Sequence, residues 1–275
     1  MTYARHLHET SPAVHCMSLA QLARDGAWQL ARLHDRPQHL LIWTTRGQGR
    51  VTIEGIRRGV SVHNALFLPA GTLFAFEIGA QGFGQGVLIP PEAAPTLPEG
   101  PRHLRIRDTF AQSECTGLLE AMQREQVSGR ALAAEAMGAH ASLLAVWLRR
   151  QLDANEGGTF GNGRETAAER LVRRYCRMVA QDFRSDRVMS DYAAALEVTP
   201  THLTRVCKEC CGLTAADILT ERVLWEARSL LIRPEPAIQD IARHLGFSSA
   251  GYFTRFIQHH TGQTPSALRR VPARG

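Results

Sequence analysis

The sequence predicts an α+β protein of two domains: an antiparallel β-barrel with helices after it, and then an all-α domain. Two observations lead to this fold class. Short runs rich in β-branched and aromatic residues, separated by turn residues, occupy residues 25–90. Beyond residue 166 the apolar residues recur with the period of a helix. A length of 275 residues also fits two domains of ~100–200 residues each.

Six runs are predicted to be strands of the N-terminal domain. They are residues 28–34, 39–45, 49–55, 64–71, 72–79 and 84–90. Glycine-containing turns punctuate them, and a proline-rich loop at 90–101 follows the last run. Many short strands at even spacing are typical of a small antiparallel barrel or sandwich. We assign residues 1–108 to this domain.

Residues 109–153 change to a helical period and are predicted to form two helices. Several residues make the second helix apolar over more surface than one core needs: Leu132, Met137, Leu143, Leu144 and Leu148. This excess predicts a dimerisation region, and packing onto the barrel alone is the alternative. Residues 154–165 are rich in glycine, asparagine and threonine, and are predicted to be a flexible linker.

The C-terminal domain, residues 166–275, contains an internal repeat. Residues 191–214 and 240–264 each have the pattern of helix, tight turn, helix. The second helices of the two copies align at an offset of 50 residues, whereas the first helices align at 49. One extra residue is therefore expected in the second turn. We place the two helix-turn-helix units at about residues 189–212 and 238–262.

The second helix of each unit has an outward face suited to the major groove of DNA. This face is small, polar and basic, and Thr199 and Ser248 are expected to cap the two helices. Arginine can bond guanine through two hydrogen bonds, and threonine can contact base edges or a thymine methyl group. The candidate DNA-binding residues are Thr199, Thr201, Thr204, Arg205, Lys208, Ser249, Gly251, Thr254, Arg255 and Gln258.

A predicted helix at residues 215–232 separates the two units. Its 18 residues span about 27 Å at ~1.5 Å per residue. A turn of B-DNA is about 34 Å, so this helix could hold two recognition helices in successive major grooves of double-stranded DNA. Residues 164–275 carry 17 Arg and Lys against 12 Asp and Glu, which favours a polyanionic partner. The alternatives are a helical bundle with a duplicated hairpin and an arginine-rich composition unrelated to DNA.

Residues 170–270 resemble the DNA-binding domain of the AraC/XylS family of transcription regulators. The matching residues of the first unit are Ala193, Leu196, Thr199, Pro200, His202, Leu203, Thr204, Arg205 and Gly212. Those of the second unit are Ile241, Ala242, Leu245, Gly246, Phe247, Ser248, Tyr252, Phe253, Thr254, Arg255, Phe256, Gly262, Thr264 and Pro265. The chain departs from the family at Ile257, Leu268 and Cys207, of which the first two remain apolar.

The N-terminal half resembles the cupin-like effector-sensing barrel of the same family, through residues 39–55 and 67–76. Enzymatic cupins place histidines and a glutamate after the first strand pair and another histidine after a Pro-x-Gly turn. Here Gly49 is followed by Arg-Val-Thr-Ile, and the Pro69-x-Gly71 turn by Thr-Leu-Phe. We therefore expect a binding barrel with no metal and no cofactor.

The resemblance implies a cytoplasmic transcription regulator, most simply an activator, that is not an enzyme. It implies a small-molecule effector in the barrel, a homodimer, and RNA polymerase as a candidate partner. The alternatives are a cupin-type enzyme with an accessory helical domain, and a DNA-binding regulator without a ligand. No run approaches the ~18 apolar residues of a membrane helix, so no membrane partner is expected.

The candidate effector-binding residues are Arg32, His34, Trp43 and Phe76, which lie on predicted strands of the barrel. An arginine there would suit a carboxylate ligand, and core or outward packing is the alternative for each residue.

Three other groups are candidate sites. The pair His34 and His39, which flanks Asp35, is a candidate for a metal or an effector. The cluster Cys207, Cys210 and Cys211 is a candidate metal site or redox switch, and the pair His259 and His260 is a candidate metal site or catalytic pair. Solvated histidines, thiols packed as small hydrophobes and a basic helix end are the respective alternatives.

Overall fold

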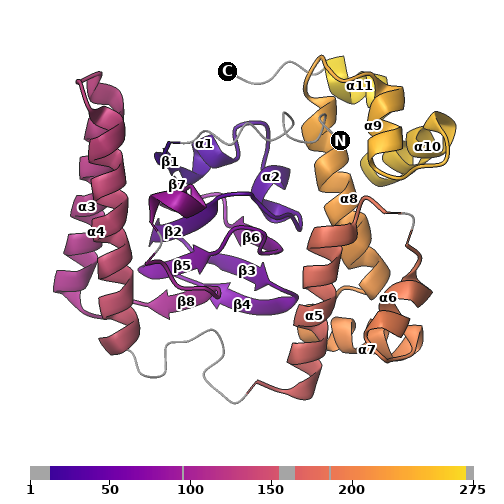
Figure 1. Ribbon diagram of the computed structural model, residues 1–275, viewed down its shortest axis with the longest axis horizontal. Coiled ribbons are helices and arrows are strands. Elements are labelled where there is room, and N and C mark those ends of the chain that lie inside the picture. The colour runs from indigo at the N-terminus through magenta and orange to yellow at the C-terminus, as the bar shows by residue number, and fades with distance from the viewer. Residues whose placement is uncertain (1–12, 95, 155–164, 186, 271–275) are drawn as a thin grey trace.

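Strands within residues 13–94 and 96–154 form two antiparallel sheets in the N-terminal half (Figure 1). The structure is a computed structural model, and it also describes residues 165–185 and 187–270. The larger sheet has the order β1 (His15–Ser18), β7 (Phe83–Ile89), β2 (His39–Arg46), β5 (Asn64–Leu68) and β8 (Arg102–Arg105). The smaller sheet has the order β4 (Ile56–Val60), β3 (Gly49–Ile53) and β6 (Phe74–Ile78).

Alternation along β2 and β5 gives the larger sheet two buried faces. Leu40, Ile42 and Leu66 pack against the smaller sheet, whereas Leu41 and Trp43 pack on the opposite side. The two sheets thus enclose a core, and the predicted fold class is confirmed. Since β4 and β8 are both edge strands of their sheets, the barrel is open between them in the part of the chain that the structure describes.

The segment predicted as the first strand, residues 28–34, is not a strand. It forms the short helix α2 (Trp28–Ala31), and only His34 makes a bridge, to Phe74. Leu30 is the buried residue of this helix, and the backbone is already extended at Arg32, before the buried Leu33 and His34. The strands β1, β4 and β8 were not predicted. β1 and β8 have four residues each, and β4 and β8 are rich in arginine.

Helices cover the outer face of the larger sheet. α3 (Thr109–Ser128) and α4 (Ala133–Ala154) form an antiparallel hairpin, as expected for residues 109–153. Asp108 caps α3 by accepting from the N–H of Ala111 at 3.0 Å. Two short helices complete this half, α1 (Leu19–Leu22) and the 3-10 helix η2 (Pro91–Ala93).

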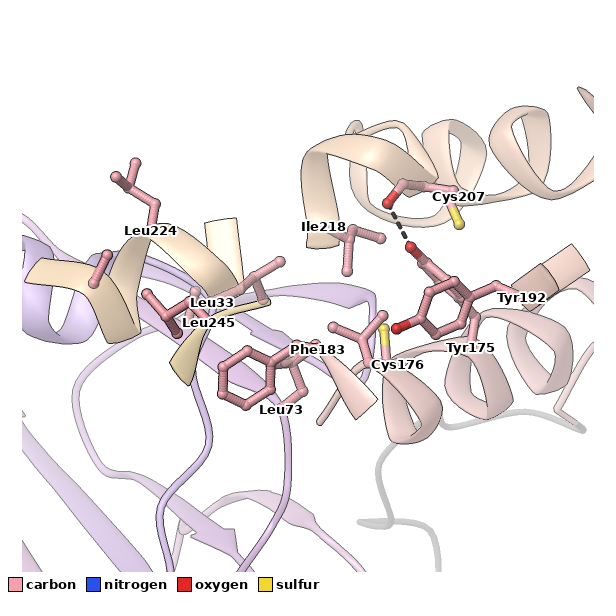
Figure 2. Packing of buried hydrophobic residues seen from close by; sticks show 14 of the residues in the cluster. Leu33, Leu73, Tyr175, Cys176, Phe183, Tyr192, Cys207, Ile218, Leu224 and Leu245 are labelled. Atoms are coloured by element: carbon pink, nitrogen blue, oxygen red, sulfur yellow. Dashed lines mark hydrogen bonds between the residues drawn. The ribbon is translucent and has the colours of Figure 1, made fainter. Parts of the chain in front are cut away.

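The C-terminal half contains helices alone among its described residues. They are α5 (Ala167–Asp182), α6 (Met189–Ala195), α7 (Pro200–Cys211), α8 (Ala215–Leu231), α9 (Ile238–His244), α10 (Ala250–Thr261) and α11 (Pro265–Arg270). Figure 2 shows their shared core, in which Tyr175 and Tyr192 meet edge to face with ring centroids 5.6 Å apart. Tyr175 also donates its hydroxyl to the carbonyl of Ala215 at 2.6 Å.

The two helix-turn-helix units differ by one residue in the turn, as the sequence predicted. Residues 196–199 connect α6 to α7, and residues 245–249 connect α9 to α10. Each turn needs one residue with a left-handed backbone. This residue is Glu197 in the first unit (φ 59°) and Gly246 in the second (φ 77°).

The C-terminal helices pack against the outer face of the smaller sheet. Leu33, Leu73 and Ala75 belong to the same buried cluster as the helical core, and Figure 2 shows the first two close to Phe183. Gly55 faces α5 so closely that a Cβ atom there would lie 2.2 Å from Val172 Cγ1. The predicted linker 154–165 lies almost wholly outside the described residues. No helix in the described ranges has the length and apolar content needed to cross a membrane.

Candidate nucleic-acid interface

The first recognition helix, α7, is defined at both ends by its sequence. Thr199 caps it by accepting from the N–H of His202 at 3.2 Å, and Pro200 occupies its first turn. Gly212 ends it with a left-handed φ of 81°. Leu203, with Val206 and Cys207, faces the core. The predicted contacts Thr201, Arg205 and Lys208 are exposed, whereas Thr204 is half-buried.

The second recognition helix, α10, begins one residue later than expected. Ser249, and not Ser248, is its cap and accepts from the N–H of Tyr252 at 3.1 Å. The extra residue of the second turn lies before the cap, so the offset of 50 already applies at the cap itself. Gly251, Arg255 and Gln258 are exposed on the outer face of this helix.

Two candidate contacts are already engaged within the free protein. Thr254 is half-buried and donates its hydroxyl to the carbonyl of Ala250 at 2.9 Å. Arg205 pairs with Glu209, and its other terminal nitrogen lies 3.2 Å from His202 Nδ1. Sequence reasoning missed Glu209, although its position four residues after Arg205 on a helix could have indicated the pair. A base contact by Arg205 would require this side chain to leave Glu209.

The connecting helix α8 packs against both units through its buried residues, which belong to the core of the C-terminal half. Its 17 residues span about 26 Å at ~1.5 Å per residue. Thr214 and Asp217 form a capping box at its start, which lowers the pKa of Asp217 chiefly through the Thr214 hydrogen bonds. A rigid helix of this length fixes the separation of α7 and α10.

The pair His259 and His260 lies in the last turn of α10, before Gly262 ends the helix with φ 72°. The His260 ring packs on Phe256, with centroids 4.7 Å apart. Burial and the neighbouring His259 lower the pKa of His260. Throughout the described residues no group of three or more metal-ligating side chains is placed to hold a metal ion.

A fourth cysteine, which the sequence did not indicate, lies beside the cluster Cys207, Cys210 and Cys211. Cys176 of α5 lies with Cys207, Cys210 and Cys211 of α7, and Figure 2 shows Cys176 and Cys207 within the helical core. Burial raises the pKa of Cys207 to about 12 and also raises that of Cys176. Cys176, Cys207 and Cys211 are buried in the helical core, and the half-buried Cys210 packs against it.

The four candidate effector residues do not converge. Arg32 and His34 lie at the contact with α8, where Arg32 pairs with Glu221 at 2.6 Å. Trp43 lies on the helix-covered face of the larger sheet, and Phe76 lies between the two sheets. His34 and His39 are also engaged separately: His34 stacks on Trp225 with centroids 4.6 Å apart. His39 Nδ1 accepts from the N–H of Ala70 at 3.0 Å.

A buried charge network joins the N-terminal half to α8. Arg222, whose side chain is 1% exposed, pairs with Asp35 and with Glu226, the latter at 3.0 Å. Glu226 is fully buried and also pairs with Arg184 at 2.8 Å. The four-residue spacing of Arg222 and Glu226 could have indicated their pair, but no sequence signal links Arg222 to Asp35, 187 residues away.

Aromatic residues and a second ion pair extend the same contact. Trp225 Nε1 donates to the carbonyl of Gln29 at 3.0 Å. On the side of α5, Glu54 is 4% exposed and accepts from Arg177 Nε at 2.7 Å. The helix that separates the two recognition helices is thus held directly by the β-domain.

Comparison with known proteins agrees with this geometry. Residues 192–271 match a family model described as a helix-turn-helix domain. The chain is 38% identical over 68 residues to the probable transcription factor PqrA of Proteus vulgaris, covering 25% of this chain and 56% of that protein. It is 28% identical over 93 residues to the bifunctional transcriptional activator and DNA repair enzyme AdaA of Bacillus subtilis, covering 34% and 44%. The matches thus cover about half the length of these relatives.

Among solved structures, fatty-acid-bound ToxT of Vibrio cholerae is similar over 93% of this chain and 94% of its own, at 13% identity and a TM-score of 0.44. The C-terminal domain of AraT, a response regulator of Geobacillus stearothermophilus, is 28% identical over 39% of this chain and 88% of its own, with a TM-score of 0.36.

The paired units and the matched family model define the C-terminal half as a helix-turn-helix DNA-binding domain. More particularly, it is a domain of the AraC type that occurs in transcription regulators, so the resemblance seen in residues 170–270 is confirmed. The prediction of two helix-turn-helix units in the C-terminal half is confirmed with it.

Proposed function

We propose that this chain regulates transcription by binding double-stranded DNA through α7 and α10, under the control of a small molecule bound by the β-domain. The observation that carries the proposal is the direct contact of the β-domain with α8, the helix that sets the spacing of the recognition helices. The chain acts by binding and not by catalysis. Its place of action is the cytoplasm, with activation through RNA polymerase as the simplest outcome at a promoter.

The proposed DNA surface is the exposed outer face of α7 and α10. Arg205 and Arg255 are the candidates for base contacts, because arginine can bond guanine through two hydrogen bonds. Lys208 and Gln258 lie further along the same faces, and Thr201 lies in the first turn of α7. The caps Thr199 and Ser249 already hold helix N–H groups, so we assign them a positioning role.

Control by an effector requires two arrangements of the recognition helices with different affinity for the ligand. The network of Asp35, Arg222 and Glu226 favours the arrangement seen here, in which the β-domain holds α8. An effector that binds better when this contact is loosened would shift the population away from it. In this proposal residues 1–108 form the sensor domain, residues 109–153 form the dimerisation region, and residues 166–275 form the DNA-binding domain.

The proposed homodimer uses the outer face of α4. Leu143 and Val146 are 53% and 39% exposed, and with Ala139 they have the three- and four-residue spacing of a coiled-coil seam. An antiparallel second copy would bring Glu135 of one chain to Arg149 of the other, since these lie seven residues on either side of position 142. This charge complementarity favours a second copy over any other occupant.

The dimer has a simple test. Leu143→Glu should convert the protein to a monomer in sedimentation velocity, whereas Val127→Glu, which changes an equally apolar but more exposed residue of α3, should leave the dimer intact. A wild-type protein that sediments as a monomer at micromolar concentration would contradict the seam.

Binding of DNA is tested by selecting genomic fragments with the full-length protein. We expect enriched fragments that share a sequence, with affinity that falls steeply as salt rises. The absence of any shared sequence among bound fragments would refute specific recognition.

A further inference from the structure

Arg205 lies at the centre of the exposed face of α7, and an acidic residue lies beside it. At ~3.6 residues per turn, His202 and Glu209 lie on one side of Arg205, and Thr201 and Lys208 lie on the other. All five residues are exposed. Of the five, Glu209 carries the charge that the phosphates of DNA repel. A carboxylate at this place on a recognition helix therefore needs a reason.

The guanidinium of Arg205 is occupied at both terminal nitrogens in the free protein. Its Nη1 pairs with Glu209, and its Nη2 lies 3.2 Å from His202 Nδ1, which accepts because a guanidinium can only donate. Arginine binds guanine through two N–H groups, so a base must displace these partners. The side chains of Arg205 and Glu209 are 58% and 53% exposed, and exposed ion pairs contribute little to stability. A better set of partners can therefore open the pair easily.

The second recognition helix holds its arginine in a different way. Arg255 corresponds to Arg205 at the offset of 50 residues, but the position of Glu209 is taken by His259. Arg255 lies over the ring of Tyr252, with its Cζ 5.8 Å from the ring centroid. An aromatic ring leaves the net charge of a guanidinium in place and its N–H groups available. α7 thus presents an arginine balanced by a carboxylate, whereas α10 presents a cationic one.

This difference matters on DNA because phosphates attract an uncompensated cation at any sequence. While Arg205 stays paired with Glu209 it neutralises no phosphate, so α7 gains little from random DNA. The pair opens without loss only where the bases replace both partners. Guanine O6 and N7 accept from arginine, and the N4 amino group of cytosine donates to glutamate. The two side chains are four residues apart, about 6 Å along the helix axis, so they can reach neighbouring base pairs.

We propose that Glu209 is a specificity-determining residue of α7. It withholds Arg205 from phosphates and from other bases, and it accepts from a cytosine amino group beside the guanine that Arg205 binds. Arg255, which lies on an aromatic ring instead, adds affinity at any sequence. This inference rests on the proposed function, because it assigns a role within the DNA surface of α7.

The test compares the full-length wild-type protein with Glu209→Gln on a selected DNA site and on scrambled DNA of the same length. Glutamine has nearly the shape and helix propensity of glutamate, so the fold is retained. Affinity for scrambled DNA should rise about three-fold, because Arg205 is released to the phosphates, and its dependence on log salt should steepen by about 0.9, the value for one more phosphate contact. The ratio of specific to non-specific affinity should fall about ten-fold.

The matched control is Asp240→Asn, which removes the same charge from an exposed ion pair on α9. Asp240 pairs with Arg243 at 3.1 Å, and the two side chains are 48% and 73% exposed. A change in net charge away from the recognition helices alters the affinity for both DNAs by a similar factor. The ratio of specific to non-specific affinity should therefore stay the same in this variant.

Selection from a random DNA library provides a second measurement. Sites bound by the wild type should have a cytosine beside the guanine whose preference is lost in Arg205→Ala. In Glu209→Gln the preference for this cytosine should disappear or change to adenine, which glutamine binds. An unchanged affinity ratio in Glu209→Gln, an equal change in Asp240→Asn, or a retained preference for cytosine would overturn the inference.

The same selection separates this inference from the proposed function. A wild-type protein that enriches no shared sequence refutes the proposed function. A shared sequence that Glu209→Gln enriches equally well refutes the role of Glu209 alone.

Discussion

Replacing Asp35 by asparagine tests whether the β-domain holds α8 through charge. Asp35 pairs with Arg222, whose side chain is 1% exposed, whereas the Asp35 side chain is 20% exposed. Removing one partner of a fully buried ion pair costs about 3–5 kcal/mol, because the other charge is left uncompensated. Here Arg222 keeps Glu226 at 3.0 Å, and Asp35 is partly solvated. We therefore expect Asp35→Asn to lower the free energy of unfolding by about 2 kcal/mol.

Urea unfolding followed by tryptophan fluorescence measures this effect, since the buried Trp225 lies on the same helix. The matched control is Glu77→Gln, which makes the same acid-to-amide change in an ion pair with Arg50 whose partners are 54% and 48% exposed. An exposed ion pair contributes about 0–1 kcal/mol to the free energy of unfolding, so Glu77→Gln should have little effect. In a protein that already carries Arg222→Met, Asp35→Asn should lower the free energy of unfolding much less than it does in the wild type. Equal losses for Asp35→Asn and Glu77→Gln would refute the reasoning.

Three further results are expected. Arg205→Ala should weaken binding to a selected DNA site by about 1–3 kcal/mol in a gel-shift titration, and an unchanged affinity in the folded variant would exclude a base contact. In urea unfolding, the contribution of His103 to the free energy of unfolding should fall by about 2 kcal/mol from pH 7 to pH 5. The reason is that burial lowers the pKa of His103 to about 4 in the folded state, whereas it is near 6.5 in the unfolded chain. This stability is complete above the unfolded pKa and is lost as the pH falls toward 4, so His103→Gln should lack it, and identical pH profiles would contradict the assignment. Gly246→Ala should destabilise the protein more than Gly262→Ala in the same assay, since both positions have left-handed φ but only Gly246 would place a Cβ atom 2.9 Å from a carbonyl oxygen, that of Arg184. Equal losses would show that the backbone contact has no effect.

The helix-turn-helix repeat could be predicted because its determinants are local. Capping residues, a left-handed turn and an apolar face are all set by residues within one or two helical turns of each other. The cap of α10 was predicted at Ser248, whereas the structure places it at Ser249. An alignment of two copies cannot locate an insertion within a turn. The residue with the left-handed backbone also differs between the two turns: it is Glu197 in the first unit and Gly246 in the second.

The sensor domain was less predictable because its features depend on distant contacts. Residues 28–34 resemble a strand in composition, but they form a short helix up to Ala31, and only His34 bridges to a strand. The effector candidates were chosen by residue type on predicted strands, and strand register then placed Trp43 and Phe76 on different faces. Asn64 and His103 meet only through the pairing of β5 with β8, and β8 had no recognisable strand pattern.

The central claim is that α7 and α10 occupy successive major grooves of one DNA site. Hydroxyl-radical footprinting of full-length protein on a selected fragment tests it most directly. We expect two protected patches about one helical turn apart on the same DNA face, with one patch lost in Arg205→Ala and the other in Arg255→Ala. A single patch that both variants weaken equally, or protection that neither variant alters, would contradict the account.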